Sequence, residues 1–148
     1  MQYGREMGID VVQNTAYTSP DGIRVSSSVV RRLLTEGDVA LAARCLGRPY
    51  QLQGTVAHGF AEGRKMGFPT ANLDVSGLPL LIPARGVYAV RVGFGNEACV
   101  RPAMLNIGQR PTFGGLLTTI EAHVFHFNAD VYGQPMRVAF VDRLRQEQ

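Results

Sequence analysis

The residues best suited to chemistry lie in one short stretch, GRKMGFPTAN, which covers residues 63–72. Three glycines precede or interrupt it at intervals of four: Gly59, Gly63 and Gly67. Glycines placed in this way let main-chain N–H groups approach phosphate oxygens closely. The pattern has neither the Gly-Lys-Ser/Thr ending of a P-loop nor the following helix of a dinucleotide fingerprint. The spacing therefore leaves two interpretations open, a phosphate-binding loop and a mobile connection between strands.

The end of the same stretch adds two side-chain oxygens. Pro69 favours an extended backbone before it, so FPTANL predicts a short strand in which Thr70 and Asn72 point to the same side. Neutral oxygens supplied sparingly, with phosphates and water completing the shell, suit Mg²⁺ bound to a nucleotide. The alternative is that both side chains only stabilise a turn.

A carboxylate further along the chain, Glu121, is a candidate general base. In the expected strand 119–127 it shares one side with His123, Phe125 and Phe127. Aromatic and imidazole neighbours can adjust the basicity of a carboxylate by desolvation, as the deprotonation of an alcohol requires. The alternative is a solvent-facing charge on the outside of a barrel. His123 and His126 face opposite ways in this strand, so a zinc site at the pair is not expected.

The elements that position these residues are two short helices followed by a sheet. Serines at 26–28 are candidate N-caps of a helix that ends at Gly37, and Asp38 caps a second helix that ends at Gly47. From residue 50 the hydrophobic period becomes two. The expected strands cover residues 52–58, 86–94, 98–108, 119–127 and 136–144. Short Gly/Pro/Asn-rich connections predict antiparallel pairing in a closed or nearly closed barrel, which protects its edges.

The composition is that of a globular chain. The apolar share of 45% and the charged share of 18% exclude the disordered class for these 148 residues. A net charge of +3, with the basic residues scattered, argues only weakly for nucleic acid and fits an anionic small molecule as well. Cys45 and Cys99 match no zinc or redox spacing, and no segment resembles a signal peptide or a membrane span. We therefore expect a cytoplasmic protein.

The motifs together resemble the riboflavin kinase family. The string G-x-x-x-G-x-x-x-G-F-P-T-A-N-L at 59–73 is similar to the ATP-binding signature of that family. Further similar pieces follow in the same order: GVYAV (86–90), NIGQRPTF (106–113), IEAHVF (120–125), VYG (131–133) and RLR (143–145). The resemblance implies a mainly β fold, a six-stranded antiparallel Greek-key barrel. It also implies transfer of the ATP γ-phosphate to the 5′-hydroxyl of riboflavin, giving FMN.

The resemblance implies roles for individual residues. Contacts to ATP and its phosphates are implied for Gly59, Gly63, Gly67, Thr70 and Asn72. Of these, Thr70 and Asn72 would hold Mg²⁺, and Glu121 would be the catalytic base. Further candidates for contacts to flavin or nucleotide are Asn106, Arg110, Thr112 and Arg145. Turn chemistry in a Gly/Pro-bounded loop is the alternative for the first three, and a surface arginine is the alternative for Arg145.

The first third of the chain has a resemblance of its own. VSSSVVRR at 25–32 is similar to the ISSTxIR element of the adenylyltransferase module of bifunctional bacterial FAD synthetases. The element implies phosphate contacts for Ser26, Ser27, Ser28 and Arg31, with simple helix capping as the alternative. The paired-histidine motif HxGH of that module does not occur in the sequence, so adenylyltransferase activity is not expected from this chain alone.

The two resemblances predict a division of the chain. Residues 1–49 are expected to be the end of an adenylyltransferase module with a helical linker, and residues 50–148 a riboflavin kinase barrel. The C-terminal helix that packs beside the isoalloxazine ring in the family is not expected here. Two other functions stay open, an inactive fragment that keeps the barrel and a non-catalytic barrel that binds nucleic acid. Aromatics make up only 8% of the residues, which argues against nucleic acid as a partner. The resemblance implies two small molecules, ATP and riboflavin, as partners, and no membrane partner is expected.

Overall fold

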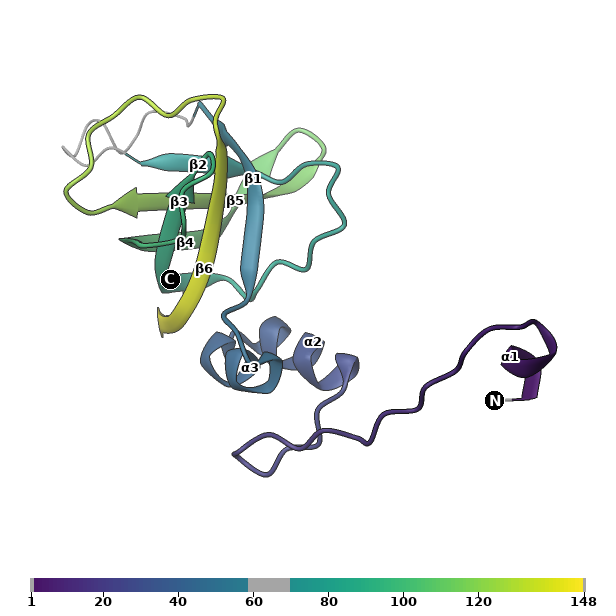
Figure 1. The fold of residues 1–148 in the computed structure, drawn as a ribbon. Helices are drawn as coiled ribbons and strands as arrows, with labels where there is room; N and C mark the ends of the chain where they lie inside the picture. Colours follow the sequence, from purple (N-terminus) through teal and green to yellow (C-terminus); the bar gives the residue numbers. More distant parts are fainter. Residues whose placement is uncertain (1, 59–69, 148) are drawn as a thin grey trace.

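The structure is a computed structural model that describes residues 2–58 and 70–147. Within these residues the elements are α1 (Gln2–Glu6), α2 (Ser27–Glu36), α3 (Val39–Leu46), β1 (Gln51–Ala57), β2 (Ala71–Asp74), β3 (Gly86–Phe94), β4 (Arg101–Thr112), β5 (Gly115–Val124) and β6 (Pro135–Arg145). The strands form a barrel, α2 and α3 lie at one of its ends, and α1 lies apart on an extended arm (Figure 1). None of the helices described has the length and apolarity needed to cross a bilayer.

The six strands close into an antiparallel barrel in the order β1-β2-β5-β4-β3-β6. Strands β3, β4 and β5 pair consecutively, and β6 returns to pair with β3 on its other side. A fourth strand placed beside the first of three consecutive strands is the Greek-key arrangement. Closure gives every strand two neighbours, which removes the exposed sheet edges that favour aggregation. The predicted barrel is confirmed.

Alternate residues of each strand face the inside of the barrel and are buried. Tyr88 and Phe140 are the largest of them, and their rings meet edge to face with centroids 5.2 Å apart. The others include Leu52, Val56, Ala71, Leu73, Val90, Val92, Phe94, Ala103, Leu105, Ile107, Ile120, Ala122, Val124, Met136 and Val138. Burial of these side chains drives the barrel to close and leaves the outward positions between them free to carry polar groups.

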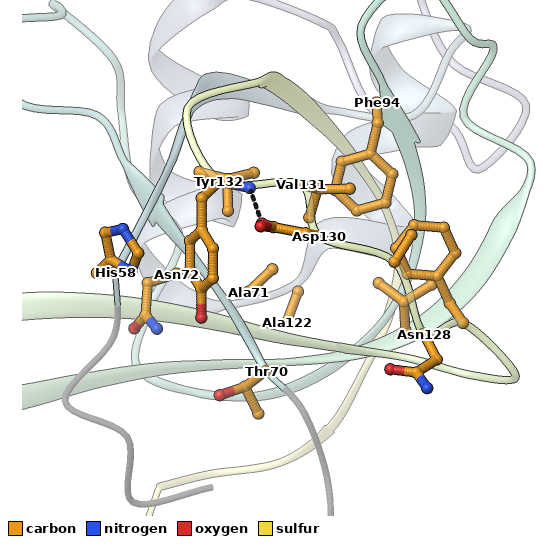
Figure 2. Close-up of a pocket in the computed structure, with 14 residues that line it drawn as sticks. His58, Thr70, Ala71, Asn72, Phe94, Ala122, Asn128, Asp130, Val131 and Tyr132 are labelled. Atoms are coloured by element: carbon orange, nitrogen blue, oxygen red, sulfur yellow. Dashed lines mark hydrogen bonds between the residues drawn. The ribbon is translucent and has the colours of Figure 1, made fainter. Parts of the chain in front are cut away.

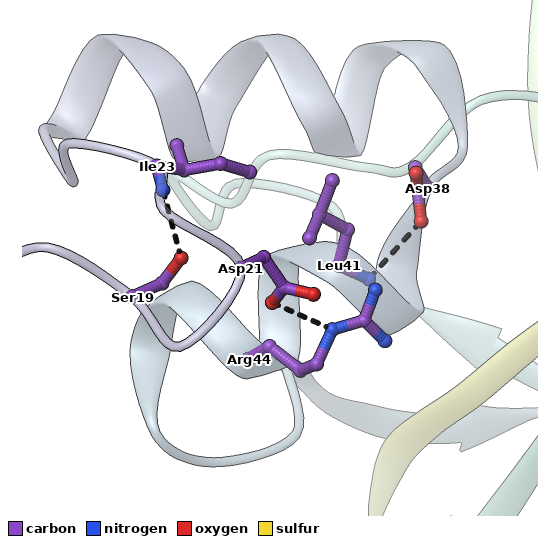
Figure 3. Close-up of polar contacts among 6 residues, drawn as sticks. All are labelled: Ser19, Asp21, Ile23, Asp38, Leu41 and Arg44. Atoms are coloured by element: carbon purple, nitrogen blue, oxygen red, sulfur yellow. Dashed lines mark hydrogen bonds and ion pairs between the residues drawn. The ribbon is translucent and has the colours of Figure 1, made fainter.

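The two helices ahead of the barrel begin and end where their capping residues predict. The Ser26 hydroxyl accepts a hydrogen bond from the Val29 N–H at 3.2 Å. Asp38 likewise accepts the Leu41 N–H at 3.0 Å and starts α3 (Figure 3). Gly37 ends α2 in a left-handed conformation with φ of 85°. The two predicted helices are confirmed, and α1 is an additional short helix.

Polar contacts fold the turn before α2 against α3. The Ile23 N–H donates to the Ser19 hydroxyl at 3.3 Å, which closes the turn. Arg44 Nε then donates to the Asp21 carboxylate at 2.9 Å (Figure 3). These contacts attach residues 18–24 to the helices, whereas the arm before them extends away from the barrel (Figure 1).

Arg143 joins the helices to the barrel. Its Nη1 donates to the carbonyl of Glu36 at 3.1 Å, at the C-terminal end of α2, and its Nη2 donates to the carbonyl of Arg85. A cation near a helix C-terminus also interacts favourably with the helix dipole. Gly37 leaves the space for this contact, because a Cβ there would lie 2.6 Å from Arg143 Nη1. The guanidinium carbon lies 5.9 Å from the centroid of the Tyr88 ring.

Two of the expected strand boundaries are wrong. The strand expected at 98–108 is β4, which starts at Arg101 and runs on to Thr112. The expected loop around Asn106, Arg110 and Thr112 is therefore strand, paired with β5 as far as Thr112↔Gly115. Hydrogen bonding across this hairpin overrides the loop signal of its Gly and Pro residues.

The other correction concerns β5, which runs from Gly115 to Val124 instead of over 119–127. A turn follows at once, and His126 adopts a positive φ of 52° that a strand does not allow. Phe125 and Phe127 therefore lie beyond the strand and do not share the side of Glu121. The strands expected at 86–94 and 136–144 match β3 and β6 closely.

Candidate functional site

A cavity of about 440 Å³ opens at the end of the barrel opposite α2 and α3. We call it the barrel-end cavity, and it is lined by Val56, His58, Thr70, Ala71, Asn72, Phe94, Ala122, Val124 and residues 127–132. Strands β1, β3 and β5 end here and β2 begins here, so four strands deliver residues to one place. The loop between β5 and β6 forms the remaining wall.

Polar side chains lie on more than one side of the barrel-end cavity, with His58 and Asn72 on one side and Asn128 on the other (Figure 2). Thr70 and Asn72 both line the cavity, although β2 itself begins only at Ala71. His58 follows the end of β1, and its ring stacks on Tyr132 with centroids 3.9 Å apart and 23° between the ring planes. The apolar part of the lining includes Phe94, Val56, Ala122 and Val124.

The β5–β6 loop, which forms this wall, is fixed by hydrogen bonds near the end that leads into β6. The Tyr132 N–H donates to the Asp130 carboxylate at 3.1 Å (Figure 2). The Gly133 N–H donates to the carbonyl of Val56 at 2.8 Å, and the Val56 N–H donates to the carbonyl of Gln134 at 2.9 Å. Tyr132 and Asp130 are thereby held against the end of β1.

A second cavity, of about 600 Å³, lies on the outer face of the barrel. We call it the outer groove, and it is lined by Thr70, Val87, Met104, Asn106, Glu121, His123, Arg145 and Glu147. Glu121, on β5, is half-buried in the groove. Its direct partners in the strand pairing are Asn72 on β2 and Asn106 on β4. Side chains opposite each other in antiparallel strands share one face, so the carboxylate has an amide side chain on each flank.

Glu121 thus lies on the barrel exterior, as the alternative interpretation expected, but in a groove rather than on an open surface. Beside Glu121 the groove is lined by Asn106, His123 and Met104, and not by Phe125 and Phe127. Arg145 supplies a cation to the groove.

Glu147 supplies a second carboxylate, which lies 3.8 Å from Arg85 Nη1. Gly108 has no side chain to obstruct it, because a Cβ there would lie 2.4 Å from Glu147 Oε1.

Thr70 lines both the barrel-end cavity and the outer groove. The alternation of β5 explains why the two spaces adjoin, since Ala122 and Val124 line the first while Glu121 and His123 line the second. A group bound over Thr70 in one cavity is therefore close to a group bound in the other. Such an arrangement suits transfer of a chemical group between two ligands.

Thr70 and Asn72 by themselves suit a metal cation only if a bound ligand supplies the negative charge. The described residues contain no cluster of three or more His, Cys, Asp or Glu side chains that would hold a metal ion. Thr70 and Asn72 offer two neutral oxygens in the barrel-end cavity. That donor set fits Mg²⁺ shared with phosphate oxygens and water, because Mg²⁺ keeps much of its shell from such ligands.

The other predicted site residues lie elsewhere. Arg110 and Thr112 occupy the outer part of the β4–β5 hairpin, where the Thr112 hydroxyl donates to the carbonyl of Gly115 at 3.2 Å, and neither lines the two cavities described. Ser26, Ser27, Ser28 and Arg31 are exposed on α2 and its cap, at the other end of the barrel (Figure 1). Gly59, Gly63 and Gly67 lie outside the described residues.

Several cavity residues were not predicted from the sequence. They are His58, Phe94, Phe127, Asp130 and Tyr132 in the barrel-end cavity, and Met104 and Glu147 in the outer groove. Most of the first group belongs to connections between strands, where hydrophobic periodicity carries no information. The motif VYG at 131–133 was the one indication in the sequence that the β5–β6 connection contributes residues to a ligand site.

Comparison with known proteins shows which family this chain resembles. The family model described as riboflavin kinase matches residues 46–148. The bifunctional riboflavin kinase/FMN adenylyltransferase of Escherichia coli K12 is 38% identical over 146 residues, covering 98% of this chain and 45% of the relative. The protein of the same description from Bacillus subtilis 168 is 40% identical over 127 residues, covering 84% of this chain and 39% of the relative. The chain thus spans less than half the length of these relatives.

A solved structure has the same fold. A protein from Streptococcus pneumoniae, described as a macrolide-efflux protein, superposes with a TM-score of 0.80 at 35% identity, covering 90% of this chain and 42% of that one. The barrel, its two adjoining cavities and a family match over more than half of the residues lead to one assignment. The chain belongs to the riboflavin kinase family.

Proposed function

We propose that the chain is an ATP:riboflavin 5′-phosphotransferase, in which the barrel-end cavity binds ATP and the outer groove binds riboflavin. The observation that carries the proposal is the position of Thr70 at the junction of the two cavities. The pairing of Asn72 with Glu121 supports it, because the pair brings a phosphate-side residue next to a candidate base. The family match and the names of the relatives support the same activity.

ATP fits the mixed lining of the barrel-end cavity. Its base and ribose would lie toward Phe94 and the other apolar lining residues, and its phosphates toward Thr70 and Asn72. Gly59, Gly63 and Gly67 would cover the phosphates with main-chain N–H groups. A pocket lined mostly by apolar groups with a few polar ones is typical of small-ligand sites.

Mg²⁺ fits the same place, with Thr70 and Asn72 as its protein ligands in our proposal. When bound, it would neutralise the charge of the phosphates. The remaining ligands would be phosphate oxygens and water.

The chemistry in the outer groove needs one proton transfer. Glu121 would accept the proton of the riboflavin 5′-hydroxyl as that oxygen bonds to the γ-phosphorus and the bond to the ADP oxygen breaks. Asn72 and Asn106 flank the carboxylate and would orient it. Arg145 would contact the flavin side of the groove, and Asn106 would also do so. Positioning and electrostatics supply most of the catalysis in phosphoryl transfer, so a small barrel suffices.

We also propose that residues 1–49 are the end of an adenylyltransferase module. The family model begins at residue 46, whereas the alignment with the Escherichia coli relative covers nearly the whole chain. Ser26, Ser27, Ser28 and Arg31 would then be the remnant of its phosphate-binding element, which is exposed here. FMN adenylylation is not proposed for this chain alone.

One assay tests the kinase proposal. The chain is incubated with riboflavin, ATP and MgCl₂, and FMN is measured by chromatography, with EDTA as the metal-free control. We expect FMN to form only with Mg²⁺ present. Flavin binding without FMN formation would instead support an inactive barrel. Failure to bind flavin and ATP, together with salt-sensitive binding of oligonucleotides, would support a nucleic-acid module.

A further inference from the structure

One wall of the barrel-end cavity is the loop from Phe127 to Gln134, and its position depends on contacts at its two ends. At the second end, backbone hydrogen bonds join Gly133 and Gln134 to Val56. These bonds continue the strand ladder into β6 and do not depend on side chains. The first end follows the turn after β5 and is held in a different way.

Phe127 is held by side chains from the end of β3 and the start of β4. Its ring stacks on Phe94, with centroids 5.0 Å apart and 14° between the planes. The guanidinium carbon of Arg101 lies 4.9 Å from the centroid of the same ring, which is a cation–π distance. Phe94 and Phe127 line the barrel-end cavity, and Arg101 lies outside it.

Arg101 is itself held in place by a carboxylate. Its Nε and Nη2 donate to the two carboxylate oxygens of Glu97, each at 3.0 Å. Such bidentate pairing fixes the plane of the guanidinium as well as its position. These hydrogen bonds lower the pKa of the Glu97 carboxyl and raise the pKa of Arg101, so both groups are charged at neutral pH.

We propose that Arg101 is a positioning residue for ATP, which acts through Phe127 to hold the β5–β6 loop against the barrel-end cavity. The inference rests on the proposed nucleotide-binding role of that cavity. Without Arg101, the Phe127 ring keeps its stack on Phe94 and its packing against the core but loses the cation–π contact. ATP then binds only the fraction of molecules whose loop is correctly placed, and its apparent affinity falls by that fraction.

An exposed ion pair alone would not change the apparent affinity for ATP. Side-chain exposures of 38% for Arg101 and 45% for Glu97 mean that the pair itself adds little to folding stability. The cation–π contact with a residue of the cavity wall gives the pair a functional connection. A merely structural role would change thermal stability, or would affect both substrates alike, rather than ATP alone.

The test compares Arg101→Met with a matched control, Arg91→Met, which removes an exposed arginine from β3. The steady-state KM for ATP and for riboflavin, and kcat, are measured for both variants and the wild type. Direct binding of Mg-ATP is measured by calorimetry without flavin. For Arg101→Met we expect the KM and Kd for ATP to rise about two- to five-fold, with the KM for riboflavin and kcat unchanged.

Two further variants sharpen the result. Glu97→Gln, which leaves Arg101 in place but loosens it, is expected to raise the KM for ATP less than Arg101→Met does. Arg101→Lys keeps the cation and is expected to recover part of the loss, because a lysine also makes cation–π contacts. Amide hydrogen exchange of residues 127–134 gives a readout without nucleotide, and we expect the fastest exchange in Arg101→Met, intermediate exchange in Glu97→Gln and Arg101→Lys, and wild-type exchange in Arg91→Met.

The outcomes separate this inference from the kinase proposal. An unchanged KM and Kd for ATP in Arg101→Met, with the wild type forming FMN, would overturn the role of Arg101 and leave the kinase proposal intact. An equal rise in both KM values, or the same effect in Arg91→Met, would also overturn it. A wild-type chain that binds no Mg-ATP would overturn both.

Discussion

The barrel-end cavity and the outer groove share strand β5 but are built differently. In the outer groove, Asn106 and Glu121 come from strands whose spacing is fixed by the ladder. In the barrel-end cavity, His58 and the loop 127–132 come from connections and are fixed by ring stacking and a few hydrogen bonds. Strand residues hold reacting groups precisely enough for chemistry, whereas loops can adjust to admit and release a ligand. We therefore expect substitutions in the groove to change turnover and substitutions in the cavity to change nucleotide affinity.

The largest effect is expected for Glu121→Gln. The amide cannot accept the hydroxyl proton as a carboxylate does, so kcat should fall about 10²- to 10⁴-fold. The shape of the side chain is preserved, so Mg-ATP should bind as in the wild type. Steady-state kinetics and calorimetry measure the two quantities, with Glu36→Gln on the exposed end of α2 as the matched control. Wild-type turnover in Glu121→Gln would remove the base assignment.

A smaller effect is expected for Asn72→Ala. Loss of one neutral oxygen beside the phosphates should raise the Mg²⁺ concentration at half-maximal rate about ten- to a hundredfold, the range for a hydrogen bond to a charged group. The comparison is a titration of FMN formation with MgCl₂ at saturating ATP. Gln53→Ala on the exposed side of β1 serves as control. An unchanged titration in Asn72→Ala would place the metal elsewhere.

Arg143→Met tests a third region, the junction of α2 with the barrel. The substitution should leave both cavities unchanged. The variant loses hydrogen bonds to the carbonyls of Glu36 and Arg85 at the junction of α2 with the barrel. We expect the free energy of unfolding to fall by about 1–2 kcal/mol, below the full value of charged hydrogen bonds because the site is partly exposed. Urea denaturation measures the loss. A change in the KM for either substrate at low temperature would show that the helices and the cavities are coupled.

The smallest effect is expected for Tyr132→Leu. The variant removes the stack on His58 and keeps an apolar side chain in the wall. An aromatic pair contributes about 0.5–1.5 kcal/mol beyond burial, so the KM for ATP should rise by roughly two- to tenfold with kcat unchanged. Tyr17→Leu on the exposed N-terminal arm is the control. A fall in kcat without a change in the KM for ATP would contradict the division of roles between the two cavities.

The sequence predicted the parts of the site that depend on strand alternation and capping. Helix caps at Ser26 and Asp38 and the strands at 86–94 and 136–144 follow from local residues, and the structure has them. The period of two also separates Glu121 and His123 from Ala122 and Val124, as in the structure, but it did not decide which of the two sides faces outward. The positions of Phe125 and Phe127 do not follow from the period, because the turn at His126 ends β5 earlier than the pattern of apolar residues suggests.

Contacts between distant segments could not be predicted from the sequence. His58 meets Tyr132, and Arg101 meets Phe127, only because barrel closure brings the ends of several strands together. The continuation of β4 beyond Gly108 to Thr112 was similarly hidden by Gly and Pro residues, which the hairpin with β5 accommodates. Such features depend on tertiary pairing rather than on local propensity.

The most direct test of the two-cavity account is a crystal structure of the protein with Mg-ADP and FMN. The account predicts the adenine nucleotide in the barrel-end cavity, with its phosphates beside Thr70 and Asn72. It predicts the flavin in the outer groove, with its 5′-phosphate toward Thr70 and its ester oxygen within hydrogen-bonding distance of Glu121. Flavin bound in the barrel-end cavity, or a nucleotide bound away from Thr70, would contradict the account.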